Sequence, residues 1–121
     1  MRDNTSPTVG VLRQDRANVL AIEGDIDLHI SPAITEALDA MIKKKPDRIV
    51  IDLSRATYID SAGVAALMIA KQDVEAYGGK FFLSGVQETI RLILETSRLD
   101  RIFWIFPDAD AALAANEAWF T

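Results

Sequence analysis

The sequence predicts one α/β domain with a mixed, mostly parallel sheet that opens with an N-terminal hairpin, in the element order ββαβαβαβα. Apolar runs rich in β-branched residues alternate with segments whose apolar residues recur at helical spacing, a pattern typical of parallel sheets. The first two strand-like runs follow one another without a helix between them, so they must pair antiparallel. The chain has 121 residues, half of them hydrophobic, which suffices for a single core.

Five apolar runs have the length and composition of strands. The third, 47–53, is apolar throughout its middle, which is typical of a central strand buried on both faces. A polar turn at Asp15–Arg16 separates the first two runs, and residues 54–59 after the third are expected to form a loop. The predicted strands are 8–14, 17–24, 47–53, 80–85 and 101–106.

Four segments have the apolar periodicity of helices. Ser31–Pro32 begins the first, because proline fits the first helical position, and Pro46 bars its continuation. Gly78–Gly79 ends the second helix, and Asp108 or Asp110 is the expected cap of the last. The predicted helices run from Ser31 to before Pro46, then over 62–77, 86–97 and 108–120.

Charge and hydropathy exclude several classes of protein. Eighteen acidic against thirteen basic residues give a net charge of −5, and the only basic cluster is the lysine run 43–45, which argues against nucleic-acid binding. The longest apolar run, 62–70, is far shorter than the roughly 20 residues that a bilayer requires, and the N-terminus lacks a signal-peptide core. With no cysteine in the chain, the sequence fits a cytoplasmic protein that does not insert into membranes.

The stretch "YIDSAGVAAL", 58–67, places Asp60 and Ser61 at the start of an otherwise apolar helix. Asp25 and Asp27 lie in the loop after the second strand. Loops at the carboxyl ends of parallel strands share one edge of the sheet, so we expect these two loops to lie side by side. Asp60 and Ser61 have two interpretations: a helix cap, or a site of chemical modification.

The sequence lacks residues that each of the enzymatic functions considered below would require. A nucleophilic serine elbow needs glycine where Ile59 stands, and a serine hydrolase needs a base, whereas His29 is the only histidine. Gly78–Gly79–Lys80 ends a helix and is not a phosphate-binding loop. A phospho-receiver domain, with Mg²⁺ held by loop-end aspartates, would need a lysine beyond Lys80. We therefore expect no catalytic residues, no cofactor and no bound metal.

Four stretches in this order and spacing, "GDIDLHIS", "IVIDLSRATYIDSAGVAAL", "AYGGKFFLSG" and "ILETSRLDRIF", resemble the STAS domain of anti-sigma factor antagonists over about residues 8–116. The resemblance implies that the unphosphorylated protein binds an anti-sigma factor, itself a serine kinase, and so frees a sigma factor. It implies that the kinase phosphorylates Ser61, that a serine phosphatase reverses this, and that Asp27 helps to engage the kinase.

The chain departs from the family pattern at Ala62, where many members have a second hydroxyl residue, and at Arg98, where glycine is common and where we expect an altered turn. We expect the contact surface around Ser61 to include also Asp25, Asp60, Ala62 and Gly63. The small side chains of Ala62 and Gly63 would let a partner backbone approach. For Gly63, packing of the helix on the sheet is an equal alternative. Two other functions stay open: a STAS subunit of a lipid-trafficking ABC transporter, and a partner-switching module without a sigma factor.

Overall fold

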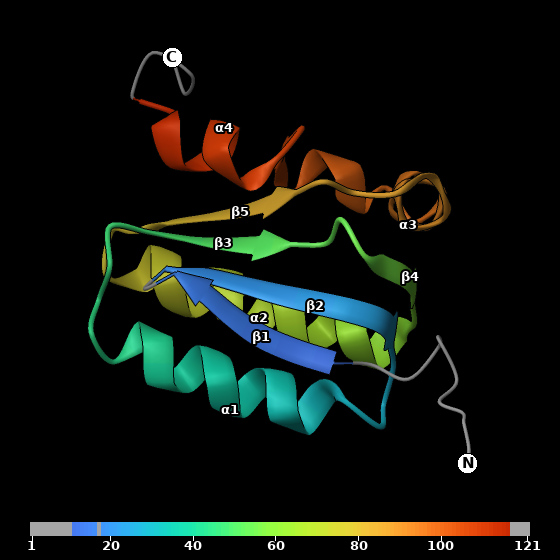
Figure 1. The fold of residues 1–121 in the computed structure, drawn as a ribbon, viewed down its shortest axis with the longest axis horizontal. Helices are drawn as coiled ribbons and strands as arrows, with labels where there is room; N and C mark the ends of the chain where they lie inside the picture. Colours follow the sequence, from blue (N-terminus) through green and yellow to red (C-terminus); the bar gives the residue numbers. More distant parts are fainter. Residues whose placement is uncertain (1–10, 17, 117–121) are drawn as a thin grey trace.

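The structure, a computed structural model, describes residues 11–16 and 18–116. The strands form a mixed sheet in the order β1-β2-β3-β5-β6, and β4 pairs with β2 beyond the end of β3 (Figure 1). The strands are β1 Val11–Arg16, β2 Val19–Ile26, β3 Arg48–Asp52, β4 Ala56–Ile59, β5 Lys80–Ser84 and β6 Trp104–Phe106. The helices are α1 Ser31–Ile42, α2 Ser61–Ala76, α3 Glu88–Thr96, the 3-10 turn η1 Leu99–Arg101 and α4 Ala109–Ala114.

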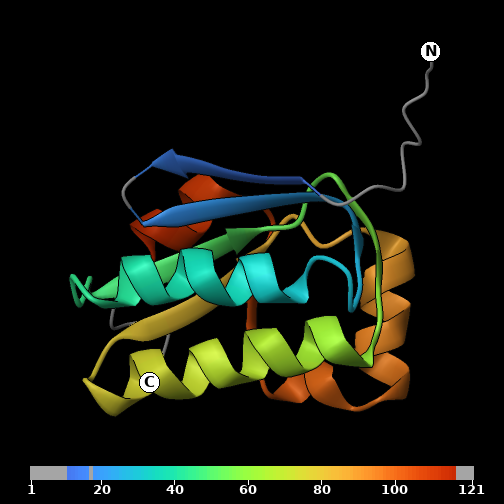
Figure 2. The same ribbon diagram turned by 90° about the horizontal axis from the view of Figure 1, so that it is seen from below.

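The sheet has a core on each face. Helices α1 and α2 lie side by side across one face (Figure 2), α4 covers the other, and α3 packs at the end of the sheet against β4. In β3, Ile49 and Ile51 point into the larger core while Val50 points into the smaller one beneath α4. The predictions of a strand buried on both faces, of an antiparallel opening hairpin and of parallel pairing elsewhere are confirmed.

The predicted loop at 54–59 is wrong over its last four residues, because Ala56–Ile59 form strand β4. Its two end residues are buried and its two middle residues are exposed, so apolar and polar residues do not alternate along the segment as they do in most strands with one buried face. The strand forms because β2 changes partner along its length: its first half pairs with β3 and its second half with β4. The change occurs at a bulge at Gly24, whose φ of 80° is readily adopted only by glycine.

Further boundaries differ from the predictions; for example, β2 ends at Ile26 and α3 begins at Glu88. The turn predicted at Asp15–Arg16 is wrong, because β1 continues through Arg16 across a bulge. The strand predicted from residue 101 begins only at Trp104, after η1. The last helix stops at Ala114, where the Arg48 guanidinium donates to the carbonyls of Ala112, Leu113 and Ala115 and so caps its end. Residues 8–10, 17 and 117–120 of the predicted elements lie outside the described residues.

Candidate functional site

Asp60 is the cap of helix α2 and also holds the neighbouring loop. Its Oδ1 accepts a hydrogen bond from the Gly63 amide at 2.9 Å, and its Oδ2 accepts one from the Leu28 amide at 3.2 Å. One carboxylate therefore joins the start of α2 to the loop that follows β2. The expected proximity of these two loops is confirmed.

Ser61 is the first residue of α2 and its side chain is exposed. Within the described part of the chain its hydroxyl makes no hydrogen bond, because the capping role belongs to Asp60. The capping interpretation thus accounts for Asp60 but not for Ser61. A free hydroxyl at a helix N-terminus is accessible to a modifying enzyme, and a phosphate placed there would meet main-chain N–H groups and the positive end of the helix dipole.

Asp27 shapes the turn between β2 and α1. Its Oδ1 accepts hydrogen bonds from the amides of His29 at 3.0 Å and Ile30 at 3.3 Å. Its main-chain carbonyl accepts from the amides of Ile30 and Ser31. The side chain is therefore a local structural element as well as a charge at the surface, which the sequence did not indicate.

The prediction that Asp25 lies in the loop after the second strand is wrong, because β2 continues through Asp25 by pairing with β4. Asp25 is half-buried at the bulge, and its Oδ1 accepts a hydrogen bond from the Thr57 hydroxyl of β4 at 3.0 Å. Among the described residues, none of Asp25, Asp27 and Asp60 forms an ion pair. The structure thus gathers three uncompensated carboxylates around the start of α2. In the same described residues, no group of three or more acidic or histidine side chains is arranged to hold a metal ion.

Gly63 is buried where α2 approaches the sheet most closely. A Cβ atom there would come within 2.7 Å of both the Ile26 side chain and the Ile26 carbonyl, and within 2.9 Å of Ile59. Such distances are too short for any side chain, so packing alone requires glycine at this position. Ala62, its neighbour, is half-buried at the helix start.

A shallow hollow of about 550 Å³ opens beside Ser61, between α2, α3 and β4. Its floor is largely apolar and its rim carries the half-exposed ring of Tyr58. The other residues that line it are Ile59, Asp60, Ser61, Val64, Ala65, Met68, Ile93, Ser97 and Leu99. Met68 and Ile93 are partly buried and also pack against the larger core, as the apolar spacing of their helices predicts. Sequence reasoning did not single out Ala65; the available signal was that Ala65 lies one helical turn after Ser61.

Comparison with known proteins identifies the fold family. The family model of the STAS domain matches residues 9–112. The chain belongs to the STAS domain family. No helix in the described residues is both long and apolar enough to cross a membrane.

Individual anti-sigma factor antagonists are similar to this chain in sequence or in fold. The anti-sigma-F factor antagonist RsfB of Mycobacterium tuberculosis is 30% identical over 108 residues, which cover 89% of this chain and 88% of RsfB. The crystal structure of an anti-sigma factor antagonist from Mycobacterium paratuberculosis superposes with a TM-score of 0.78 at 26% identity, covering 91% of this chain and 96% of that one. SpoIIAA in its unphosphorylated form shares the fold, with a TM-score of 0.70 at 21% identity over 87% of this chain and 93% of that one.

In this STAS domain, Arg98 occupies the turn after α3 with φ 61° and ψ 24°, the left-handed conformation that glycine favours. The turn in which a change was expected therefore has a backbone conformation that suits glycine. An arginine in this conformation costs the chain about 1–2 kcal/mol.

Proposed function

We propose that this protein is an anti-sigma factor antagonist whose partner is switched by phosphorylation of Ser61. The observation that carries the proposal is an exposed, unbonded serine hydroxyl in the first turn of α2, beside a cap that is already provided by Asp60. The names of RsfB and of the mycobacterial neighbour support the same class of partner. The unphosphorylated protein would bind an anti-sigma factor that is a serine kinase, in the cytoplasm, and a serine phosphatase would restore it.

The surroundings of Ser61 explain how one phosphate could act as a switch. The first-turn amides of α2 and its dipole would tolerate the added group, so the fold would not change. At the surface, the added charge of about −2 would stand among Asp25, Asp27 and Asp60 and would raise the negative potential of this face. Burying one unpaired charge at an interface costs about 2–5 kcal/mol, while a hundredfold loss of affinity needs only about 2.7 kcal/mol.

The hollow beside Ser61 supplies the non-ionic part of the proposed contact. A partner backbone can approach along Ser61, Ala62 and Ala65, where side chains are small, and an apolar side chain can enter between Met68 and Ile93. Gly63 contributes by allowing α2 to pack closely on Ile26, which fixes the height of Ser61 above the sheet. A few buried anchor residues carry most of the affinity of a protein interface. Because Ser61 itself lines the hollow, the anchor site and the serine belong to one surface.

The deciding experiment combines partner capture with phosphate mapping. Affinity capture from the native cell extract identifies the kinase, and incubation with that kinase and ATP is expected to add one phosphate, on Ser61. Ser97→Ala is the matched control, because Ser97 is exposed and lines the same hollow. Ser61→Ala is expected to abolish modification and to keep the kinase bound, and Ser61→Asp to weaken binding.

Two results would overturn the proposal. One is phosphate on Ser97 or elsewhere with Ser61 unmodified. The other is capture of ABC transporter subunits with no serine kinase, which would instead favour a transporter subunit. Loss of one cap-region residue costs only about 0.5–2 kcal/mol, so both Ser61 variants are expected to fold and the result can be interpreted.

A further inference from the structure

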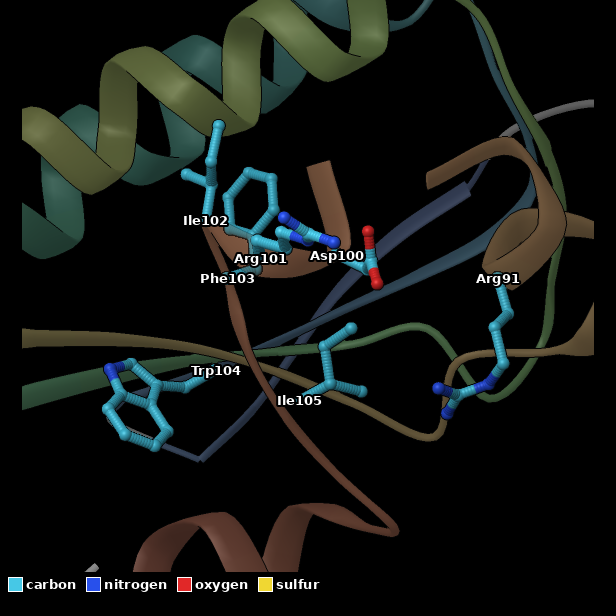
Figure 3. A pocket seen from close by; sticks show the side chains of 7 residues that line it. All are labelled: Arg91, Asp100, Arg101, Ile102, Phe103, Trp104 and Ile105. Carbon is cyan, nitrogen blue, oxygen red and sulfur yellow. The ribbon is translucent and has the colours of Figure 1, made fainter. Parts of the chain in front are cut away.

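Strand β6 is an edge of the sheet, and a hollow of about 460 Å³ opens along it (Figure 3). The Phe106 carbonyl accepts a hydrogen bond from the Gly85 amide at 3.0 Å, so the polar groups of Phe106 face β5. Main-chain groups of successive strand residues point to opposite sides. The N–H and C=O of Ile105 therefore point away from β5, toward an edge that no strand of the described residues covers, where another strand could pair with them.

The side chains along this edge differ between its two sides. In Figure 3, Arg91 extends from α3 to the side of β6 that carries Ile105, whereas Trp104 projects to the opposite side. Trp104 is 44% exposed. One side of the edge thus carries Arg91 beside Ile105, and the other carries the aromatic ring of Trp104.

The charges of this hollow are unbalanced. Within the described ranges, neither the Arg91 guanidinium nor the Arg101 guanidinium forms an ion pair or a hydrogen bond, and Asp100 is the only acidic side chain in the lining. Guanidinium groups bind carboxylates by paired hydrogen bonds. On a chain whose net charge is −5, this edge is a local site of positive potential.

We propose that the β6 edge binds an extended acidic segment of a partner protein, which adds to the sheet as a further strand. Side chains alternate between the two sides of a strand, so a segment paired with Ile105 would direct every second side chain toward Arg91 and the others toward Trp104. The matching pattern is acidic residues alternating with apolar ones. This surface lies on the far side of α3 from Ser61, and its occupancy does not depend on the function proposed for Ser61.

A second copy of this chain fits the edge poorly. Pairing two β6 edges would bring Arg91 and Arg101 of one copy close to the same residues of the other, and like charges across paired strands are destabilising. An acidic segment replaces that repulsion with attraction. The charge of the edge therefore selects the acidic partner.

The test uses the fluorescence of Trp104. The chain has two tryptophans, so Trp119→Phe in the full-length protein leaves Trp104 as the only indole. The probe is the pentapeptide acetyl-Glu-Val-Glu-Val-Glu-amide, and its controls are the lysine counterpart and the same acidic peptide with its central amide N-methylated. We expect a saturable change in Trp104 emission with the acidic peptide alone, because the lysine peptide is repelled and the methylated peptide cannot pair.

Variants then assign the contacts. Arg91→Gln and Arg101→Gln are each expected to raise the Kd of the acidic peptide about fivefold, and Asp100→Asn to lower it. Arg55→Gln removes an exposed arginine outside this hollow and is expected to change nothing. The proposal is overturned if the acidic peptide does not bind, if the methylated peptide binds equally well, or if the arginine variants match Arg55→Gln.

Discussion

Two hollows flank the segment formed by α3 and η1, and they have opposite character. The hollow beside Ser61 has an apolar floor, small side chains at the start of α2 and three nearby carboxylates. The β6 hollow has two arginines, a tryptophan and an open strand edge. One short helical segment thus separates an acidic face from a basic one, so two different partners could bind without sharing a residue.

The largest expected effect comes from filling the hollow beside Ser61. Ala65→Arg places a long cation one turn after the serine, on an exposed position, so folding is expected to be unaffected. We expect at least about a hundredfold loss of kinase affinity, measured by calorimetry, since a well-packed contact of about 2.7 kcal/mol is blocked. Ala33→Arg, on the exposed face of α1, is the control; equal losses in both variants would remove this hollow from the interface.

Gly63→Ala tests the close approach on which the same hollow depends. The added Cβ would lie 2.7 Å from Ile26 atoms, one of them main chain, so α2 must shift. We expect a loss of about 1–3 kcal/mol in the free energy of unfolding, measured by urea denaturation. Gly78→Ala has open space around its Cβ and is the comparison for backbone strain alone. A Gly63→Ala protein as stable as the parent would contradict the packing role.

Asp27 allows charge to be separated from local structure. Asp27→Ala removes the acceptor for two amides and is expected to cost about 1 kcal/mol of stability, whereas Asp27→Asn keeps an acceptor oxygen and is expected to cost only a few tenths. If the charge engages the kinase, both variants lose kinase affinity although only one loses stability. Kinase binding that tracks stability alone would show that Asp27 acts by shaping its turn.

Arg98 lies at the junction of α3 and η1, between the two hollows, and carries the smallest predicted effect. Arg98→Gly relieves the left-handed strain but adds freedom to the unfolded chain, so a net gain of about 0.5 kcal/mol is expected in the free energy of unfolding. Thermal denaturation measures it. The backbone at this position already has the conformation that glycine favours, so we expect peptide binding at β6 and kinase binding at Ser61 to be unchanged. An altered affinity at either site would show that this turn couples the two sites.

The sequence predicted most of the features that depend on local pattern. The helices and the central strand follow from periodicity. Of the two caps that the sequence offered for the last helix, Asp108 is the one used, and it accepts a hydrogen bond from the Ala111 amide at 2.7 Å. Strand β4 was missed because it exists only through pairing with the distant second half of β2. The hollow beside Ser61 was missed for a related reason: residues such as Ile93 look like core residues until the distance between two helices is known.

The bond from the Leu28 amide to Asp60 has a consequence for hydrogen exchange. Leu28 is 72% exposed and lies in a turn, where amides ordinarily exchange quickly with solvent. Its proton is instead held by the carboxylate that caps α2, so it is released when the start of α2 opens or Asp60 is drawn away. The Leu28 amide is therefore a single-proton reporter of the state of a helix 32 residues further along the chain.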